Sequence, residues 1–207
     1  NDLVAHYEYD EEVLFEMEEG DLSSYQRAAD FINLQRVDVV CLQHEYGIFG
    51  GPAGANILAL LRDLDVPLVT TLHTVLRNPN THQRQVMEEL TRLSSRLVVM
   101  TRGTRQVLRD VYHVPDRKID LIPHGIPDVP FGEGEYHKAQ FGLAGKQVLL
   151  TFGLLSPGKG IENVINALPE IVKTCPDVMY VVVGATHPNL VREQGEAYRM
   201  SLQRLCK

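Results

Sequence analysis

Short apolar runs alternate along most of this chain with longer segments of helical periodicity. The longer segments repeat apolar residues every three or four positions, which predicts amphipathic helices packed on a sheet. Alternation of this kind is typical of an α/β fold with doubly wound, Rossmann-like parallel sheets. The apolar runs, each interpreted as a buried strand, span residues 37–42, 66–72, 96–101, 119–122, 147–152 and 178–183.

Local sequence signals indicate where several of these elements begin. Asp21 precedes a segment with apolar residues on one helical face and is a suitable N-cap. Pro52 suits the first position of the next helix, because its missing N–H group is one that the first turn leaves unpaired. The segment Glu12–Met17 is interpreted as a further strand. Pro188–Cys206 is interpreted as one amphipathic helix with an apolar stripe.

A change of composition divides the chain into two predicted domains. Residues 128–146 are rich in glycine and proline and contain only a short helical stretch, as expected of a linker. Residues 1–127 are predicted to form most of an N-terminal Rossmann-like domain, with helices on both faces of its sheet. Residues 147–207 are predicted to begin a C-terminal domain, although two βα pairs make a thin sheet.

Charge and cysteine content restrict the class of protein. A formal net charge of −7 over 207 residues argues against a nucleic-acid partner, which requires a basic face. No apolar run reaches the length of a membrane span, and the acidic first residues show no signal-peptide pattern. Cys41, Cys175 and Cys206 lack metal-ligand spacing, so no metal site is predicted. Unpaired thiols fit a reducing compartment, and the prediction is a cytoplasmic protein.

The segment from Gly153 to Gly160 carries candidate chemistry. An apolar strand ends at Gly153, Ser156 and Gly158 belong to a tight turn, and a helical pattern follows Lys159. The N-terminus of a helix leaves backbone N–H groups unpaired and attracts anions, and a lysine there adds a full positive charge. An ordinary βα turn with a solvated lysine explains the same spacing, so both interpretations stay open at this point.

Three histidines fall at the predicted ends of strands, namely His44, His73 and His124. Ligands of parallel α/β sheets bind at the C-terminal ends of the strands. Each histidine alone is explained as a loop residue of no consequence, because such loops carry many polar residues. Together they predict one edge of the sheet that faces a polar ligand.

Three segments in order resemble the group 1, retaining glycosyltransferases, which have a GT-B fold. The turn Gly153–Gly160 (GLLSPGKG) is similar to the G-R-L-x-x-x-K-G turn of that family. Ile119–Gly125 (IDLIPHG) looks like the segment that ends the N-terminal domain, and Val66–His73 (VPLVTTLH) looks like the strand whose last histidine faces the donor sugar. The resemblance covers the chain from about Val37 to its end.

The departures from the family pattern are also informative. Leu154 stands where an arginine is usual, which leaves Lys159 as the principal cation, and His124 stands where asparagine is common. The paired-glutamate motif that holds the donor late in the C-terminal domain has no counterpart. The first strand and the Gly-rich acceptor loop of the N-terminal domain are also missing from the pattern. We therefore expect the chain to be a piece of a longer glycosyltransferase.

The resemblance implies transfer of a hexose from a nucleotide-diphosphate sugar to a carbohydrate or lipid acceptor, the latter at a membrane surface. It implies retention of configuration, with neither metal nor cofactor. Lys159 and the N–H groups near Gly158 and Gly160 would face the β-phosphate, with Gly153 and Ser156 completing the diphosphate site. His73 would be the catalytic residue that contacts the donor sugar or the departing phosphate.

The acceptor side of this implied site is assigned to residues of the N-terminal domain. His44, Glu45 and the turn at Gly50 and Gly51 would line it, together with His124. A pair of carboxylates of the glycosidase kind is not identified in the sequence.

Two other classes of protein share features of this pattern. A dinucleotide-dependent oxidoreductase needs G-x-G-x-x-G directly after a strand, and the glycines between residues 47 and 54 do not have that spacing. A non-catalytic sugar- or phosphate-binding module stays open as an alternative. We also expect the chain either to self-associate through residues 147–207 or to leave them poorly ordered, because the apolar stripe and strand edge there lack a predicted cover.

Overall fold

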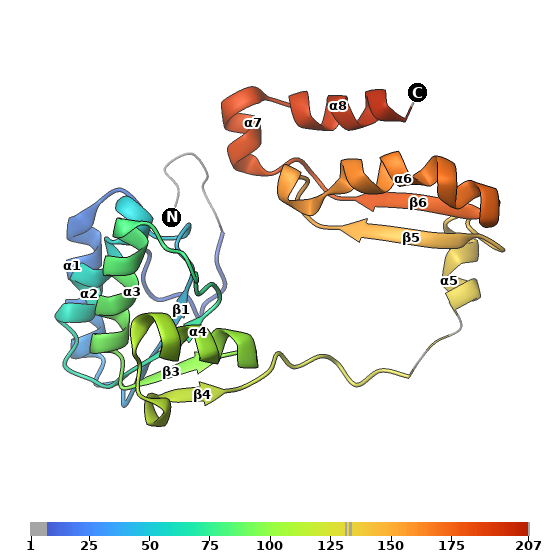
Figure 1. Ribbon diagram of the computed structural model, residues 1–207. Helices are drawn as coiled ribbons and strands as arrows, with labels where there is room; N and C mark the ends of the chain where they lie inside the picture. The colour runs from blue at the N-terminus through green and yellow to red at the C-terminus, as the bar shows by residue number, and fades with distance from the viewer. Residues whose placement is uncertain (1–7, 131, 133, 207) are drawn as a thin grey trace. The chain divides into compact units, whose positions relative to one another are not determined.

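The computed structural model describes residues 8–130, 132 and 134–206. The chain divides into two compact units, Asn1–Pro127 (unit 1) and Asp128–Lys207 (unit 2). Each unit combines helices with a parallel sheet of its own (Figure 1). The α/β class with parallel sheets that the hydrophobic pattern predicts is therefore confirmed.

Unit 1 contains a four-stranded sheet in which neighbours in sequence are neighbours in space. Its order is β1-β2-β3-β4, and every pair is parallel. The first two predicted strands pair in parallel as expected, with Val40 opposite Leu68 and His44 opposite Leu72. The strands are β1 (Val40–His44), β2 (Leu68–Leu72), β3 (Arg96–Val99) and β4 (Ile119–Leu121).

The long helices α1, α3 and α4 of unit 1 each begin at a side chain that caps them. The predicted N-cap Asp21 is confirmed, since its carboxylate accepts a hydrogen bond from the N–H of Ser23. Asn80 and Gln83 form a reciprocal capping box, and Thr101 caps the last long helix. The helices are α1 (Leu22–Leu34), α2 (Ile57–Arg62), α3 (Thr81–Leu93) and α4 (Arg102–Tyr112), with short 3-10 helices η1 (Pro52–Gly54) and η2 (Asp116–Lys118).

Helices cover only one face of the unit 1 sheet, so the prediction of helices on both faces is wrong for the described residues. On the helix-covered face, side chains at alternate positions of β2 are buried, namely Leu68, Thr70 and Leu72. On the opposite face, Cys41 and Gln43 of β1 are exposed. The reason is topological. Each strand is added on the same side of the previous one, and right-handed crossovers then place every connecting helix on the same face. Figure 1 shows α1, α2 and α3 side by side in this layer.

Two local predictions in unit 1 also need correction. Glu12–Met17 is not a strand, since β1 is the edge of the sheet, and Met17 packs on the core instead. Pro52 does begin a helical turn, but only the 3-10 helix η1. Ala53 and Gly54 take positive φ values of 55° and 76°, which separates η1 from α2.

Unit 2 is built on two parallel strands in register from Gln147 opposite Val178 to Phe152 opposite Val183. A small core of Leu155, Ile161 and Leu202, with a few neighbours, lies between the strands and two helices. The elements are α5 (Gly134–Gln140), β5 (Gln147–Phe152), η3 (Pro157–Lys159), α6 (Ile161–Thr174), β6 (Val178–Val183), α7 (Pro188–Gln194) and α8 (Ala197–Leu205).

The last predicted helix is two helices. Gly195 ends α7 with φ 60° and ψ −140°, a conformation that breaks a helix and that glycine adopts without strain. Of the apolar stripe expected on this segment, Leu202 is buried and Tyr198 is partly buried on the core, whereas Val191 and Leu205 are exposed. The stripe therefore reaches the core only through α8.

Candidate functional site

The C-terminal ends of the unit 1 strands meet at one edge of the sheet. His44 ends β1 opposite Leu72, which ends β2. The N–H group of His73 then donates to the carbonyl oxygen of His44 at 3.1 Å, which extends the pairing by one residue. Such an edge is where parallel α/β sheets bind ligands.

Two of the three predicted histidines come together at this edge. His73 and His124 are both exposed, and their ring centroids lie 6.2 Å apart. The Nε2 atom of His73 lies 2.8 Å from Oε1 of Gln43, a residue that the sequence analysis did not select. Alternation along β1 was the available signal, because Gln43 must point away from the face that carries Leu42. The edge thus presents imidazole and amide groups that can hydrogen-bond a polar ligand.

His44 does not join these residues, and the expectation that it lines the acceptor side is wrong. Strand alternation turns it to the helix-covered face, where it is fully buried. Its ring lies edge-on to Tyr46 and is stacked with Phe49. Neither ring nitrogen has a hydrogen-bond partner within the described part of the chain. Burial lowers the pKa of His44 to about 4, against a smaller opposite effect of the Glu45 carboxylate, so the ring is neutral at pH 7.

Glu45 is held at the same edge by two hydrogen bonds. Its Oε1 accepts from the N–H of Tyr46 at 2.8 Å, and its Oε2 accepts from the hydroxyl of Thr74, two residues beyond the end of β2. The side chain is half-buried. A carboxylate has about four lone-pair positions, so the two oxygens can still accept a hydrogen bond from a ligand hydroxyl.

The glycine pair after this loop has a packing role. The N–H of Gly50 donates to the hydroxyl of Tyr25, and a Cβ at Gly50 would lie 1.7 Å from the carbonyl oxygen of Glu19. Gly51 has φ +80°, which favours glycine. The structure therefore explains Gly50 and Gly51 by close approach and backbone conformation, and the Gly50 N–H is already used inside unit 1.

The second candidate site lies at the C-terminal end of β5 in unit 2. After Gly153, the residues Pro157–Lys159 form η3, and Gly160 takes the left-handed conformation that joins η3 to α6. The N–H groups of Lys159 and Gly160 donate to the carbonyl oxygens of Ser156 and Pro157. The expectation that the Gly160 N–H faces a ligand is therefore wrong in this arrangement, because the turn itself uses it.

The ammonium group of Lys159 lies next to this turn. Its ammonium nitrogen is 3.7 Å from the position that a Cβ would take on Gly153. The other described lysines of unit 2, Lys138, Lys146 and Lys173, each pair with a carboxylate, whereas Lys159 pairs with none among the described residues. The first turn of α6 also lacks a side-chain cap. An exposed, unpaired ammonium group beside an uncapped helix N-terminus suits an anionic ligand.

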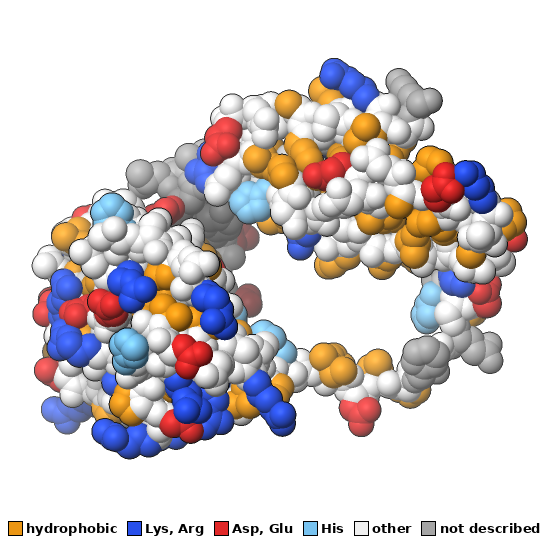
Figure 2. Space-filling view, viewed as in Figure 1, with side chains coloured by type: hydrophobic (Ala, Val, Ile, Leu, Met, Phe, Trp, Pro, Cys, Tyr) orange, Lys and Arg blue, Asp and Glu red, His pale blue; other side chains and the backbone are white. Residues whose placement is uncertain are grey.

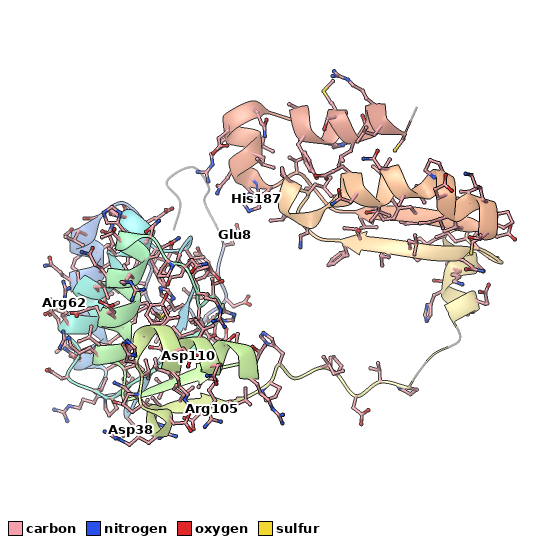
Figure 3. All side chains as sticks on the ribbon, viewed as in Figure 1. Glu8, Asp38, Arg62, Arg105, Asp110 and His187 are labelled. Carbon is pink, nitrogen blue, oxygen red and sulfur yellow. The ribbon has the colours of Figure 1, made fainter. Side chains whose placement is uncertain are left out.

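Two further residues of unit 2 surround this turn. His187 is the N-cap residue of α7 (Figure 3), and its N–H donates to the carbonyl oxygen of Leu155 at 3.0 Å, which places it beside the turn. The sequence analysis did not select His187, although it follows a predicted strand closely. Glu162, in the first turn of α6, accepts a hydrogen bond from the hydroxyl of Tyr198 at 2.9 Å. Burial, with a smaller effect of this carboxylate, raises the pKa of Tyr198 to about 12.

No group of three or more His, Cys, Asp and Glu residues is arranged to hold a metal ion in the ranges 8–130 and 134–206 or at residue 132. Over the same residues, every helix is too short or too polar to cross a membrane.

Comparisons with known proteins agree with the geometry of unit 1. The family model of the Glycosyltransferase Family 4 matches residues 10–128. A D-inositol 3-phosphate glycosyltransferase of Segniliparus rotundus is 32% identical over 140 residues, which cover 60% of this chain and 31% of that protein. A protein of the same name from Nocardiopsis dassonvillei is 27% identical over 172 residues, which cover 74% of this chain and 39% of that protein. The chain thus spans about a third of the length of these relatives.

Solved structures with the same fold cover more of the chain. Anabaena Alr3699/HepE, in complex with UDP and glucose, has a TM-score of 0.67 at 18% identity, over 88% of this chain and 47% of that one. A glycosyltransferase from Rickettsia africae ESF-5 has a TM-score of 0.56 at 19% identity, over 88% of this chain and 48% of that one. At these identities the likeness shows the fold, and it confirms the expected fold class.

Proposed function

The chain belongs to the Glycosyltransferase Family 4, and from this premise we propose that the protein is a retaining glycosyltransferase that transfers a hexose from a nucleotide-diphosphate sugar to an acceptor. The observation that carries the proposal is the Lys159 ammonium group, unpaired within the described residues, over Gly153 and beside the uncapped N-terminus of α6. The complex of the similar Anabaena protein with UDP and glucose supports the class of donor.

Lys159 and α6 would act on the leaving group by electrostatics. As the glycosidic bond to the β-phosphate breaks, negative charge grows on the departing nucleoside diphosphate. A fixed ammonium group and the backbone N–H groups in the first turn of the helix stabilise that charge without reorganising. Leu154 lies where the family usually has arginine, so Lys159 supplies the full positive charge of this turn.

The polar edge of unit 1 would serve the sugar side of the reaction. His73 is assigned to the donor sugar or the departing phosphate, because its ring is exposed and anchored by Gln43. Glu45 and His124 are assigned to the acceptor, because a half-buried carboxylate and an exposed imidazole can each bind a hydroxyl group. His44 is assigned a packing role beneath them.

The remaining parts of the proposal rest on the resemblance to retaining glycosyltransferases and, for the compartment, on the unpaired thiols. The reaction needs no metal and no cofactor, the acceptor is a carbohydrate or a lipid presented at a membrane surface, and the enzyme works in the cytoplasm. A non-catalytic module that binds the same donor is the alternative. The two are distinguished by supplying donor and acceptor and looking for glycosylated product, because a binding module retains the donor unchanged.

The test is Lys159→Ala in the intact enzyme, with Lys173→Ala, in the last turn of α6, as a matched control. A charge-assisted phosphate contact is worth roughly 1.5–3 kcal/mol, so Lys159→Ala should lower kcat/KM for the donor about 10- to 100-fold and weaken UDP binding. Lys159→Arg should recover part of the loss. Lys173, which pairs with Glu170, should be replaceable without effect. Unchanged donor KM and kcat in Lys159→Ala would show that the lysine takes no part.

A further inference from the structure

Gln43 lies beside the histidine that the proposed function places at the donor sugar. It points to the open face of the unit 1 sheet, and it is paired across the sheet with Thr71. Its amide makes two contacts there. Oε1 of Gln43 lies 2.8 Å from Nε2 of His73. The amide nitrogen of Gln43 donates to the hydroxyl oxygen of Thr71 at 3.4 Å. Gln43, on β1, therefore contacts the ring of His73, and its own side chain is held by the hydroxyl group of Thr71 on β2.

In this orientation of the Gln43 amide, the contacts indicate where the proton of a neutral His73 ring lies. The amide NH2 group of Gln43 is directed to Thr71, so its carbonyl oxygen Oε1 faces His73. A carbonyl oxygen can only accept a hydrogen bond. The Nε2 atom of His73 must then carry the hydrogen, which leaves a lone pair on Nδ1. No hydrogen bond to Nδ1 of His73 is made by the described residues.

We propose that Gln43 is a positioning residue that fixes His73 as the Nε2–H tautomer and presents its Nδ1 lone pair to a hydroxyl group of the ligand. That this hydroxyl belongs to the donor sugar rests on the proposed function. The tautomer itself does not depend on it.

The surroundings of Gln43 support this role over packing alone. The side chain is exposed, so it fills no cavity and buries little surface. The backbone of His73 is anchored through its own N–H to His44, and its ring lies 6.2 Å from that of His124, centroid to centroid. Backbone and ring neighbours thus fix where the imidazole is, and the amide of Gln43 decides which nitrogen carries the proton.

The experiment is nitrogen NMR of the imidazole of His73 in the 207-residue chain, at a pH well above the ordinary titration range of imidazole. The wild-type ring should be the Nε2–H tautomer. Gln43→Glu keeps an acceptor and should leave the tautomer unchanged. Gln43→Met has a similar length but accepts no hydrogen bond, and the loss of one neutral bond should shift the tautomer ratio about tenfold toward Nδ1–H. Gln43→Lys offers only donors and should reverse the preference.

The control is Cys41→Ser, on the same strand and the same face, which should change nothing at His73. A wild-type ring protonated on Nδ1, or a ratio unaffected by Gln43→Met and Gln43→Lys, would overturn the inference whatever the protein's activity. Transfer kinetics then test the role in catalysis separately. Gln43→Met should lower kcat/KM about three- to tenfold and Gln43→Glu should restore it. A changed tautomer with unchanged kinetics would uphold the positioning role and contradict the assignment of His73 to the donor.

Discussion

The sheet of unit 1 and the sheet of unit 2 are both parallel and both built from βα pairs, but their strands are covered to different degrees. Leu72 in β2 and Leu97 in β3 are fully buried, whereas Leu150 and Phe152 in β5 are 61% and 76% exposed. Four strands under four helices enclose a core of their own. Two strands under α6 and α8 enclose only a few residues, since a two-stranded sheet has too little surface to bury.

The uncovered faces differ in chemistry as well. In unit 1 the open face carries Gln43, Thr71 and the ion pair of Arg96 with Asp120. In unit 2 one face of the strands carries only apolar side chains, including Leu150, Phe152 and Met179, and Figure 2 shows hydrophobic side chains gathered along this sheet. The whole formal net charge of −7 lies in residues 1–127, because residues 128–207 contain equal numbers of acidic and basic residues. Unit 2 thus has an apolar surface without net-charge repulsion to keep copies apart.

The largest expected effect comes from the same truncation made in the two sheets. Leu97→Ala should lower the free energy of unfolding of unit 1 by about 2–5 kcal/mol, because it leaves a cavity in a closed core. Leu150→Ala should change the stability of unit 2 by less than about 0.5 kcal/mol, because that side chain is largely exposed already. Urea titrations followed by NMR signals from each unit measure both values. Equal losses in the two units would contradict the contrast between the sheets.

The next effect concerns the buried imidazole of unit 1. The pKa of His44 is about 4 in the folded chain, below the ordinary value near 6.5, so the unfolded chain binds the proton more readily. Stability should therefore be complete above about pH 6.5, fall as the pH drops toward 4, and level off below, with a total loss of about 3 kcal/mol. Unfolding free energies of the wild type between pH 7 and pH 4 measure this loss.

Two variants separate His44 from the other titrating groups. His44→Phe removes the titration and keeps an aromatic ring beside Tyr46 and Phe49, so the loss of stability with pH should shrink by the same amount. His82→Phe, at an exposed position of α3, is the control for replacing a histidine by phenylalanine outside the core. Identical pH profiles for the wild type and His44→Phe would show that His44 is accessible to solvent.

The smallest effect tests what the apolar face of unit 2 does in solution. We expect the 207-residue chain to form small oligomers through β5 and β6, with faster amide hydrogen exchange in these strands than in β2 and β3. Leu150→Lys should weaken association about tenfold, which corresponds to the loss of one exposed leucine from an interface. Sedimentation at several concentrations and hydrogen exchange measure the two quantities. A monomer with strongly protected residues 147–207 would contradict this expectation.

Sequence patterns alone determined which elements form, because those depend on local spacing. The apolar runs became β1 to β6, Asp21 capped α1, and the turn from Gly153 to Gly160 placed a lysine at the start of a helix. The positions of His73 and His124 at strand ends also followed from the pattern, and the structure brings their rings together. Each of these features needs only residues that are close in sequence or the rule that parallel strands end at one edge.

Tertiary structure alone decided which side chains at the end of β1 are exposed and which are buried. Gln43 and His44 are adjacent in sequence, yet pairing of β1 with β2 under one layer of helices exposes the first and buries the second. The sequence pattern placed Gly50 in a loop that lines the acceptor. In the folded chain, the carbonyl oxygen of Glu19 lies where a Cβ of residue 50 would be, so the glycine is explained by packing. Periodicity determines which residues of a strand share a face. Which face the helices cover depends on the order of the strands in the sheet. That order is set by contacts between residues far apart in the chain.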